Sequence, residues 1–330
     1  MNKRWTVGTI ILLVFFAASA VSAQHAPGKQ PRIRFEQDTD DGKMSVIIDG
    51  KLAFGYQYRK DLDLPHFYPV NSPSGKEMIV EQTEPYPHHR GFWFADKIKF
   101  DGKVADLYNA LYSGTGGSRK PYKPYHAPFR QYIRHVEFMN EHSGRSKAKI
   151  EENLVWIIEN DVPALDEHRV LNVRAMSDGA YFLDITYTLT ASYGPVEFIS
   201  DAVHYAWPYI RVNRRFSVEG GGTITNSEGG INQAGTHDKI ARWVDYSNTV
   251  DGTTEGIAIF SHPSNGYPHK WLTRDYGCFG PRRPDERSGK PFTLKKGETI
   301  SQRVGVLVHT GDVKDGAVAE RYQRYVDGKL

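Results

Sequence analysis

Strict alternation of apolar and polar side chains along residues 181–189 is the feature that most limits how this chain can fold. One side of this stretch would present Tyr181, Leu183, Ile185, Tyr187 and Leu189, and the other Phe182, Asp184, Thr186 and Thr188. Neighbouring side chains of a strand point to opposite faces of a sheet, so the pattern predicts a strand with one buried face. Further strands are predicted at 131–138, 153–158 and 165–175, with polar turns between them. Successive strands joined by short turns predict an all-β fold, a large antiparallel β-sandwich.

The two ends of the chain extend this pattern. Strands are predicted at 32–36, 43–48 and 52–58, around turns that contain Gly42 and Gly50. Residues 291–294 and 299–308 predict a closing hairpin, and the helical spacing of Ala319, Tyr322 and Tyr325 predicts a short helix over 315–326. Residues 101–128 are rich in Gly, Pro and Tyr, which predicts a long irregular segment: a binding loop, a lid or a plain surface loop.

The N-terminus is typical of a secretion signal. Lys3 and Arg4 precede the mostly apolar residues 9–18, and Ala23 ends a run of small residues suited to cleavage. We expect residues 1–23 to be a signal peptide and residues 24–330 to form one exported domain, periplasmic or secreted, without stable membrane insertion. An uncleaved membrane anchor is the alternative, because residues 5–23 are just long enough to span a bilayer.

Composition excludes some classes of protein. The formal net charge is +3 and the basic residues are dispersed, so the chain has no nucleic-acid signature. Cys278 is the only cysteine, which rules out an internal disulfide and favours a packed thiol over a nucleophile. No nucleotide-binding, phosphate-loop or zinc motif is present, and we expect no cofactor. A metal ion held by several histidines is the alternative, because histidine is a common metal ligand.

The most unusual stretch is Tyr86–Phe94, which contains two adjacent histidines, an arginine and three aromatic residues. In a regular strand His88 and Arg90 would share one face and His89 would lie on the other. Histidine titrates near neutrality and arginine is a fixed cation, so these residues are suited to acid/base chemistry beside an anion. An aromatic strand with polar residues at its end is the structural alternative.

Aromatic and arginine side chains elsewhere favour a carbohydrate ligand. Tryptophan and tyrosine cover the apolar face of a sugar ring, and arginine binds the carboxylate of a uronic acid. Arg90, Arg242 and Arg274 each lie near a tryptophan or tyrosine in the sequence. β-Elimination from a uronic acid requires that the carboxylate is neutralised and that a base takes the adjacent proton. A glycosidase with paired carboxylates is an alternative, with members among Glu167, Asp245 and Asp275.

Several stretches together resemble a bacterial family of unknown function whose members carry the label "methane oxygenase PmoA". They are Tyr68–Lys76, Pro87–Phe94, Ala241–Ser247, Ile259–Asn265, Trp271–Gly280 and Leu294–Glu298. The resemblance implies an exported protein of polysaccharide degradation, with a sandwich of the galactose-mutarotase type. The oxygenase label does not fit, because a particulate methane oxygenase subunit is a membrane protein and this chain has only an export signal.

We therefore predict a carbohydrate-active protein, with an enzyme favoured: a lyase, a dehydratase or a glycoside hydrolase acting on an oligosaccharide or polysaccharide that contains uronic acid. The predicted acid/base residues are His88, His89 and Tyr276. The predicted substrate-binding residues are Arg90, Trp93, His135, Arg242, His262, Trp271 and Arg274. A non-catalytic sugar-binding module and a sugar mutarotase or epimerase remain as alternatives.

Overall fold

The computed structural model describes residues 32–116, 126–199, 205–266, 269–283 and 291–330. Residues 31–330 form one compact unit. The expected signal peptide, residues 1–23, lies outside the described residues. Within the described part of the chain, no helix is both long and apolar enough to cross a membrane.

One layer of this unit is a nine-stranded antiparallel sheet. Its strands, in spatial order, are β1 (Ile33–Asp38), β2 (Lys43–Ile48), β3 (Lys51–Gln57), β4 (His66–Val70), β7 (Phe92–Trp93), β17 (Tyr209–Arg211), β23 (Cys278–Pro281), β22 (His269–Thr273) and β19 (Ile240–Ala241). The N-terminal strands follow the predicted hairpins closely. Asp49 and Gly50 form the tight turn between β2 and β3 with positive φ angles of 50° and 79°, which glycine and short polar residues tolerate best.

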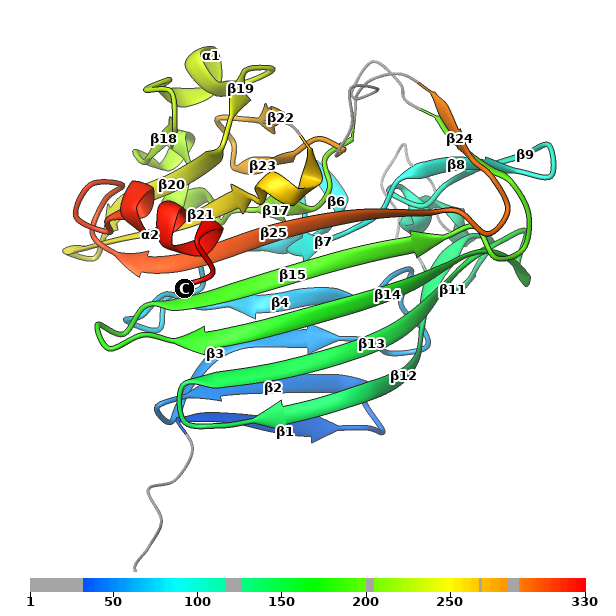
Figure 1. Cartoon of the computed structure of the whole chain (residues 1–330), viewed down its shortest axis with the longest axis horizontal. Helices are drawn as coiled ribbons and strands as arrows, with labels where there is room; N and C mark the ends of the chain where they lie inside the picture. The colour runs from blue at the N-terminus through cyan, green and yellow to red at the C-terminus, as the bar shows by residue number, and fades with distance from the viewer. Residues whose placement is uncertain (1–31, 117–125, 200–204, 267–268, 284–290) are drawn as a thin grey trace, which may run out of the picture. The chain divides into compact units, whose positions relative to one another are not determined.

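The second layer is an eight-stranded antiparallel sheet. Its order is β12 (Tyr132–Ser143), β13 (Lys147–Ile158), β14 (Val162–Ala175), β15 (Tyr181–Thr190), β25 (Thr299–Thr310), β21 (Thr253–Ser261), β20 (Trp243–Val250) and β18 (Thr223–Asn226). The alternation along β15 is confirmed, because Tyr181, Leu183, Ile185, Tyr187 and Leu189 are all buried. In Figure 1 strands β12 to β15 lie in front of strands β1 to β4.

Aromatic side chains join the two sheets. Phe94, just after β7, stacks on Tyr187 of β15 with ring centroids 4.3 Å apart, and Tyr246 of β20 packs on Phe279 of β23 at 4.5 Å. Each such pair contributes about 0.5–1.5 kcal/mol beyond the burial of its surface. The predicted all-β sandwich is confirmed by these two layers and their shared core.

Smaller elements complete the unit. A four-stranded sheet has the order β24 (Phe292–Leu294), β16 (Val196–Phe198), β8 (Lys97–Phe100) and β9 (Lys103–Asp106). Two short two-stranded sheets pair β5 (Glu81–Thr83) with β6 (Tyr86–Arg90) and β10 (Gly114–Thr115) with β11 (His126–Phe129). The helices are α1 (Asn232–Thr236) and α2 (Val318–Val326), with 3-10 turns η1 (Ala110–Ser113), η2 (Arg214–Phe216), η3 (Val218–Gly220) and η4 (Pro263–Asn265). Helix α2 is the predicted terminal helix, and its Tyr325 packs on Phe182, on the side of β15 opposite Tyr181.

Two expectations were wrong. The predicted closing hairpin does not form, because β24 pairs with β16 while β25 pairs with β15 and β21. Residues 101–128 are not irregular throughout. They contain β9, η1 and β10, and β11 begins at His126. The hairpin was lost to long-range pairing, since β16 lies far from β24 in the chain. Within residues 101–128 the strands pair locally, β9 with β8 and β10 with β11.

Candidate functional site

The two adjacent histidines do not alternate as a regular strand would require. The rings of His88 and His89 contact each other at a centroid distance of 4.5 Å, so the prediction that they face opposite sides was wrong. The short β5–β6 hairpin is irregular, with a shift in pairing between Glu81 and Thr83. Gly91 follows with φ of +83°, and a Cβ there would lie 3.0 Å from the carbonyl oxygen of Phe67. This glycine lets the chain turn sharply from β6 into β7.

Tyrosines around η1 hold both imidazoles by hydrogen bonds. His88 Nδ1 lies 2.8 Å from the Tyr112 hydroxyl, and His89 Nε2 lies 3.1 Å from the Tyr108 hydroxyl. Tyr108 stacks on Tyr205 at 4.2 Å, and the Tyr205 hydroxyl donates to a carboxylate oxygen of Asp106 at 3.2 Å. The orientation of each histidine ring is therefore set by residues that are themselves packed or hydrogen bonded.

The nine-stranded sheet supplies the floor of this cluster. Trp93 pairs with Tyr209 across β7 and β17, and Arg211 pairs with Cys278 across β17 and β23, so these side chains project from one face. Phe92, Ile210 and Phe279 pair with one another and project from the opposite face, where Phe279 packs on Tyr246 of the other sheet. His89 stacks on Trp93 at 5.2 Å, and Trp93 stacks on Tyr209 at 5.0 Å.

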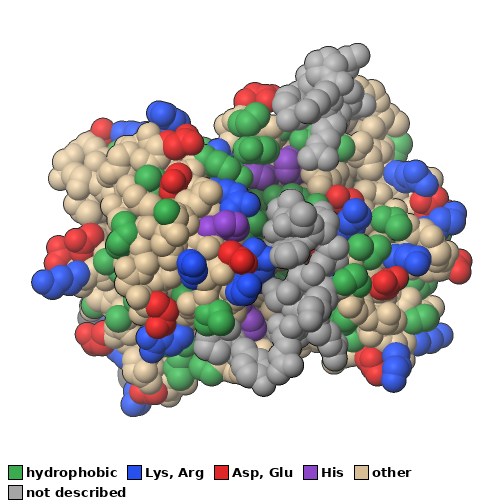
Figure 2. Space-filling model, turned by 90° about the horizontal axis from the view of Figure 1, so that it is seen from above, with side chains coloured by type: hydrophobic (Ala, Val, Ile, Leu, Met, Phe, Trp, Pro, Cys, Tyr) green, Lys and Arg blue, Asp and Glu red, His purple; other side chains and the backbone are tan. Residues whose placement is uncertain are grey.

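Tyr276 and Arg211 join the same cluster through Tyr86. The Tyr86 ring stacks on both His89 and Tyr276, with centroids 5.0 and 5.2 Å apart. The Arg211 guanidinium carbon lies 4.5 Å from the centre of the Tyr276 ring, and Nη1 donates to the Tyr276 carbonyl oxygen. A cleft of about 540 Å³ adjoins these groups, with Tyr86, Tyr276, Arg211, Asn213, Arg214 and Glu219 in its wall. Figure 2 shows a face of the molecule on which histidine, basic and acidic side chains gather around a hollow.

Burial controls the protonation of this cluster. It lowers the pKa of His89 well below the ordinary value, and the nearby charges of His88 and Arg211 lower it further. His89 is therefore neutral at pH 7. Burial raises the pKa of Tyr276 and that of Tyr108, so both phenols keep their protons at neutral pH. The positive charges of Arg274 and Arg211 partly oppose the rise at Tyr276, which places Arg274 near this group as well.

Several buried polar atoms of this cluster have no hydrogen-bond partner in the described part of the chain. Among them are Nδ1 of His89, Nε1 of Trp93 and Nε of Arg211. Buried polar groups are nearly always hydrogen bonded, and leaving one unsatisfied costs about 1–3 kcal/mol. Several such atoms in one cluster indicate a place where a polar ligand or ordered water completes the hydrogen bonding.

Three of the predicted substrate-binding residues are buried: Arg90, Trp271 and Trp93. Arg90 forms an ion pair with Asp63 at 2.6 Å, and the two side chains are 4% and 1% exposed. Trp271 is fully buried, and its Nε1 donates to the carbonyl oxygen of Ala241 at 2.8 Å. Trp93 is also buried, beneath His89. Neither tryptophan presents an open face to a sugar, and Arg90 is already paired with a carboxylate.

The structure places His135, His262 and Arg242 outside the cluster. His135 Nδ1 lies 2.7 Å from the Glu152 carboxylate, beside a separate cleft of about 780 Å³ that includes Tyr58 and Phe138. His262 packs on Tyr325 of α2 at 5.0 Å. Arg242 is exposed and lies 3.3 Å from Glu228.

The carboxylates considered for a glycosidase pair are engaged separately. An oxygen of the Asp245 carboxylate lies 2.8 Å from His309 Nε2, and Glu167 accepts hydrogen bonds from Arg169 and Trp156. Asp275 accepts a hydrogen bond from the backbone of Gln233 at 2.8 Å. Across the described ranges, no three His, Cys, Asp or Glu side chains are grouped to hold a metal ion.

The sequence predicted site roles for His88, His89, Trp93, Arg274 and Tyr276, and in the structure these residues lie close together. No site role was predicted for Tyr86, Tyr209 or Arg211. The alternation of Tyr209 and Arg211 around the apolar Ile210 was the available signal. Their meeting with His89 depends on the pairing of β7, β17 and β23, which lie far apart in the chain.

The fold and the site together define an all-β sandwich with an aromatic histidine–arginine cluster on one sheet. By its sequence the chain belongs to a family of unknown function, DUF6807, whose model matches residues 43–323. This match neither supports nor contradicts the methane oxygenase label. The chain matches no curated protein sequence.

Solved structures show weaker similarities. An α-galactosidase of Geobacillus stearothermophilus is 7% identical with a TM-score of 0.44, over 86% of this chain and 42% of that one. A polysaccharide lyase is 12% identical with a TM-score of 0.38, over 83% and 34% of the two chains. A galactose 1-epimerase of Lactobacillus acidophilus is 8% identical with a TM-score of 0.36, over 86% and 100%. The chain thus spans less than half of the first two proteins, and similarities of this size do not identify an activity.

Proposed function

We propose that this chain is an exported enzyme that removes a proton from a uronic acid residue of an oligosaccharide and cleaves the chain by β-elimination. The proposal depends on one observation: the neutral imidazole of His89 and the guanidinium groups of Arg211 and Arg274 lie in one cluster. His89 has a lowered pKa and an unpartnered Nδ1, and Arg211 and Arg274 both act on the neighbouring Tyr276. Export is part of the proposal and rests on the N-terminal sequence.

The arginines would bind the carboxylate of the uronic acid. Charge-assisted hydrogen bonds to both oxygens neutralise the carboxylate and make the proton on the adjacent carbon more acidic. Arg211 is suited to this role because its Nε is buried without a partner and its guanidinium already stacks on Tyr276.

His89 would take that proton. When the ring proton is on Nε2 and is donated to the Tyr108 oxygen, Nδ1 carries the lone pair of a general base. Electrons of the broken C–H bond form the C=C bond, and those of the cleaved C–O bond leave with the departing sugar oxygen. Tyr276 would give its proton to this oxygen, because burial keeps the phenol protonated. His89 is only 2% exposed and the Tyr86 ring stacks on it, so side chains around His89 would have to move before a substrate reaches Nδ1.

A second candidate is sugar binding without chemistry. It is favoured by the extent of aromatic stacking around Tyr86 and by the burial of His89, which is only 2% exposed. A binding module needs aromatic faces and hydrogen bonds but no base.

The test is a product screen with the purified mature protein and oligosaccharides of several uronic acids. A new absorbance band of an unsaturated uronate, without added water in the mass spectrum, is the expected result. A product with added water indicates hydrolysis and overturns the elimination. No product, together with measurable binding in a calorimeter, indicates the binding module.

A further inference from the structure

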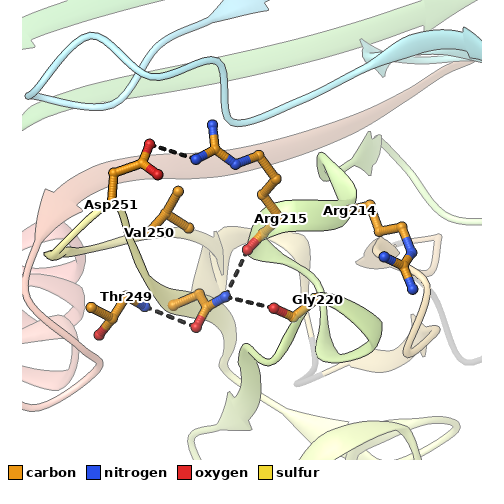
Figure 3. Close-up of a pocket in the computed structure, with 7 residues that line it drawn as sticks. Arg214, Arg215, Gly220, Thr249, Val250 and Asp251 are labelled. Carbon is orange, nitrogen blue, oxygen red and sulfur yellow. Dashed lines mark hydrogen bonds and ion pairs between the residues drawn. The ribbon is translucent and has the colours of Figure 1, made fainter.

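A second pocket adjoins the cleft beside Tyr276. It measures about 390 Å³ and is lined by Arg214, Arg215, Gly220, Asn248, Thr249 and Asp251 (Figure 3). Arg214 lines both this pocket and the cleft beside Tyr276. Two consecutive residues of η3 line different spaces: Glu219 lines the cleft and Gly220 lines the pocket. The two spaces therefore meet around η2 and η3.

Most polar groups of the second pocket are engaged within the protein. Arg215 forms an ion pair with Asp251 at 2.5 Å. The Asn248 side chain donates to the carbonyl oxygens of Arg215 and Gly220 at 2.6 and 3.1 Å and accepts from the Thr249 backbone at 2.8 Å. These contacts hold the wall of the pocket in place and leave these groups little capacity for a ligand.

Arg214 differs from its neighbour Arg215. Its side chain is 74% exposed and lies 3.9 Å from the Glu219 carboxylate, which is itself 52% exposed. Figure 3 shows Arg214 projecting away from the Arg215–Asp251 pair. An exposed ion pair contributes only about 0–1 kcal/mol, so the Arg214 guanidinium can exchange Glu219 for a ligand carboxylate at small cost.

We infer that Arg214 binds the carboxylate of a second acidic sugar, so that the substrate is a linear oligosaccharide with at least two uronic acid residues. This inference rests on the proposed function, because it takes the cleft beside Tyr276 as the place of the first uronic acid. One residue would lie against Tyr276 and Arg211, and the next would extend past Arg214 into the second pocket. The expected substrate is then an oligosaccharide with several uronic acid residues, and not an oligosaccharide with a single one.

The experiment compares Arg214→Gln with the wild-type protein on two substrates: a disaccharide with one uronic acid residue and one neutral sugar, and a tetrasaccharide of the same uronic acid. The expected loss of kcat/KM on the tetrasaccharide is about tenfold, as for one charge-assisted hydrogen bond, and is carried by KM. The loss on the disaccharide is expected to be below about twofold, because its neutral sugar offers Arg214 no carboxylate. Arg34→Gln is the matched control: Arg34 is 48% exposed, lies 3.1 Å from the exposed Glu36 and lines neither pocket. An equal loss on both substrates, or no loss on either, overturns the inference.

A binding titration separates this inference from the proposed function. If the wild-type protein turns over neither substrate, calorimetric binding of the same two oligosaccharides is measured for the wild-type protein and both variants. If the wild-type protein binds the tetrasaccharide more tightly than the disaccharide and Arg214→Gln abolishes this difference, the inference is supported even though the proposed elimination is not. Equal binding of the two oligosaccharides, unchanged by Arg214→Gln, overturns the inference, whatever the outcome for catalysis.

Discussion

Replacing Arg90 by Met distinguishes the role predicted from the sequence from the role that the structure gives this residue. The sequence predicted that Arg90 binds a substrate carboxylate. In the structure its guanidinium lies 2.6 Å from Asp63, and both side chains are almost completely buried. Arg90→Met keeps much of the side-chain volume and removes the charge, so Asp63 loses the partner of a buried ion pair.

The expected loss of unfolding free energy is large. Removing one member of a buried ion pair typically costs about 3–5 kcal/mol, because the other charge stays buried without compensation. The double variant Arg90→Met/Asp63→Leu removes both charges, and we expect it to recover most of that loss, since apolar replacement of a whole pair is often close to neutral. Urea unfolding followed by circular dichroism measures all three proteins.

Ligand binding provides the second measurement. We expect Arg90→Met, measured where it is still folded, to bind a uronate oligosaccharide within about twofold of the wild-type protein, because Arg90 is buried away from ligands. A loss of unfolding free energy below about 1 kcal/mol combined with lost uronate binding would refute the structural role. Arg90 would then be the carboxylate-binding residue that the sequence predicted.

The remaining predictions concern the base, the acid, pH and a control. His89→Gln should lower kcat by about 10²–10⁴-fold in the elimination assay, because it removes the general base, and unchanged turnover would exclude that role. Tyr276→Phe should lower kcat on a substrate with a poor leaving group more than on one with a good leaving group, and an equal loss on both would contradict its role as the acid. Burial lowers the pKa of His269 to about 4, whereas the same imidazole in the unfolded chain has a pKa of about 6.5. As the pH falls below about 6.5, the unfolded chain therefore binds a proton at His269 that the folded chain does not. The unfolding free energy should fall by about 3 kcal/mol by pH 4. His269→Gln should remove this part of the pH dependence in urea unfolding at pH 7 and pH 4.5, and an unchanged dependence would refute the assignment. His135→Ala should leave turnover within about twofold in the same elimination assay, since His135 pairs with Glu152 outside the cluster, and a large loss would bring that separate cleft into the mechanism.

Local patterns in the sequence were enough to predict the class of fold. Alternation along β15 and tight turns such as Asp49–Gly50 depend on neighbouring residues, so they can be recognised without tertiary information. The spacing of Tyr322 and Tyr325 predicted α2 for the same reason. The closing hairpin failed because β24 and β25 each find partners far away in the chain, and nothing in a local window distinguishes those partners.

The candidate site was only partly predictable, because chemical type is local and contact is not. The sequence by itself determined that His88, His89, Tyr276 and Arg274 are suited to acid/base and anion-binding chemistry. Only the tertiary structure decided that Arg90 is neutralised by Asp63 and that Arg211 joins the cluster instead. The physical reason is that the protonation and availability of a side chain depend on burial and on the charges that the folded chain brings to it, as the lowered pKa of His89 shows.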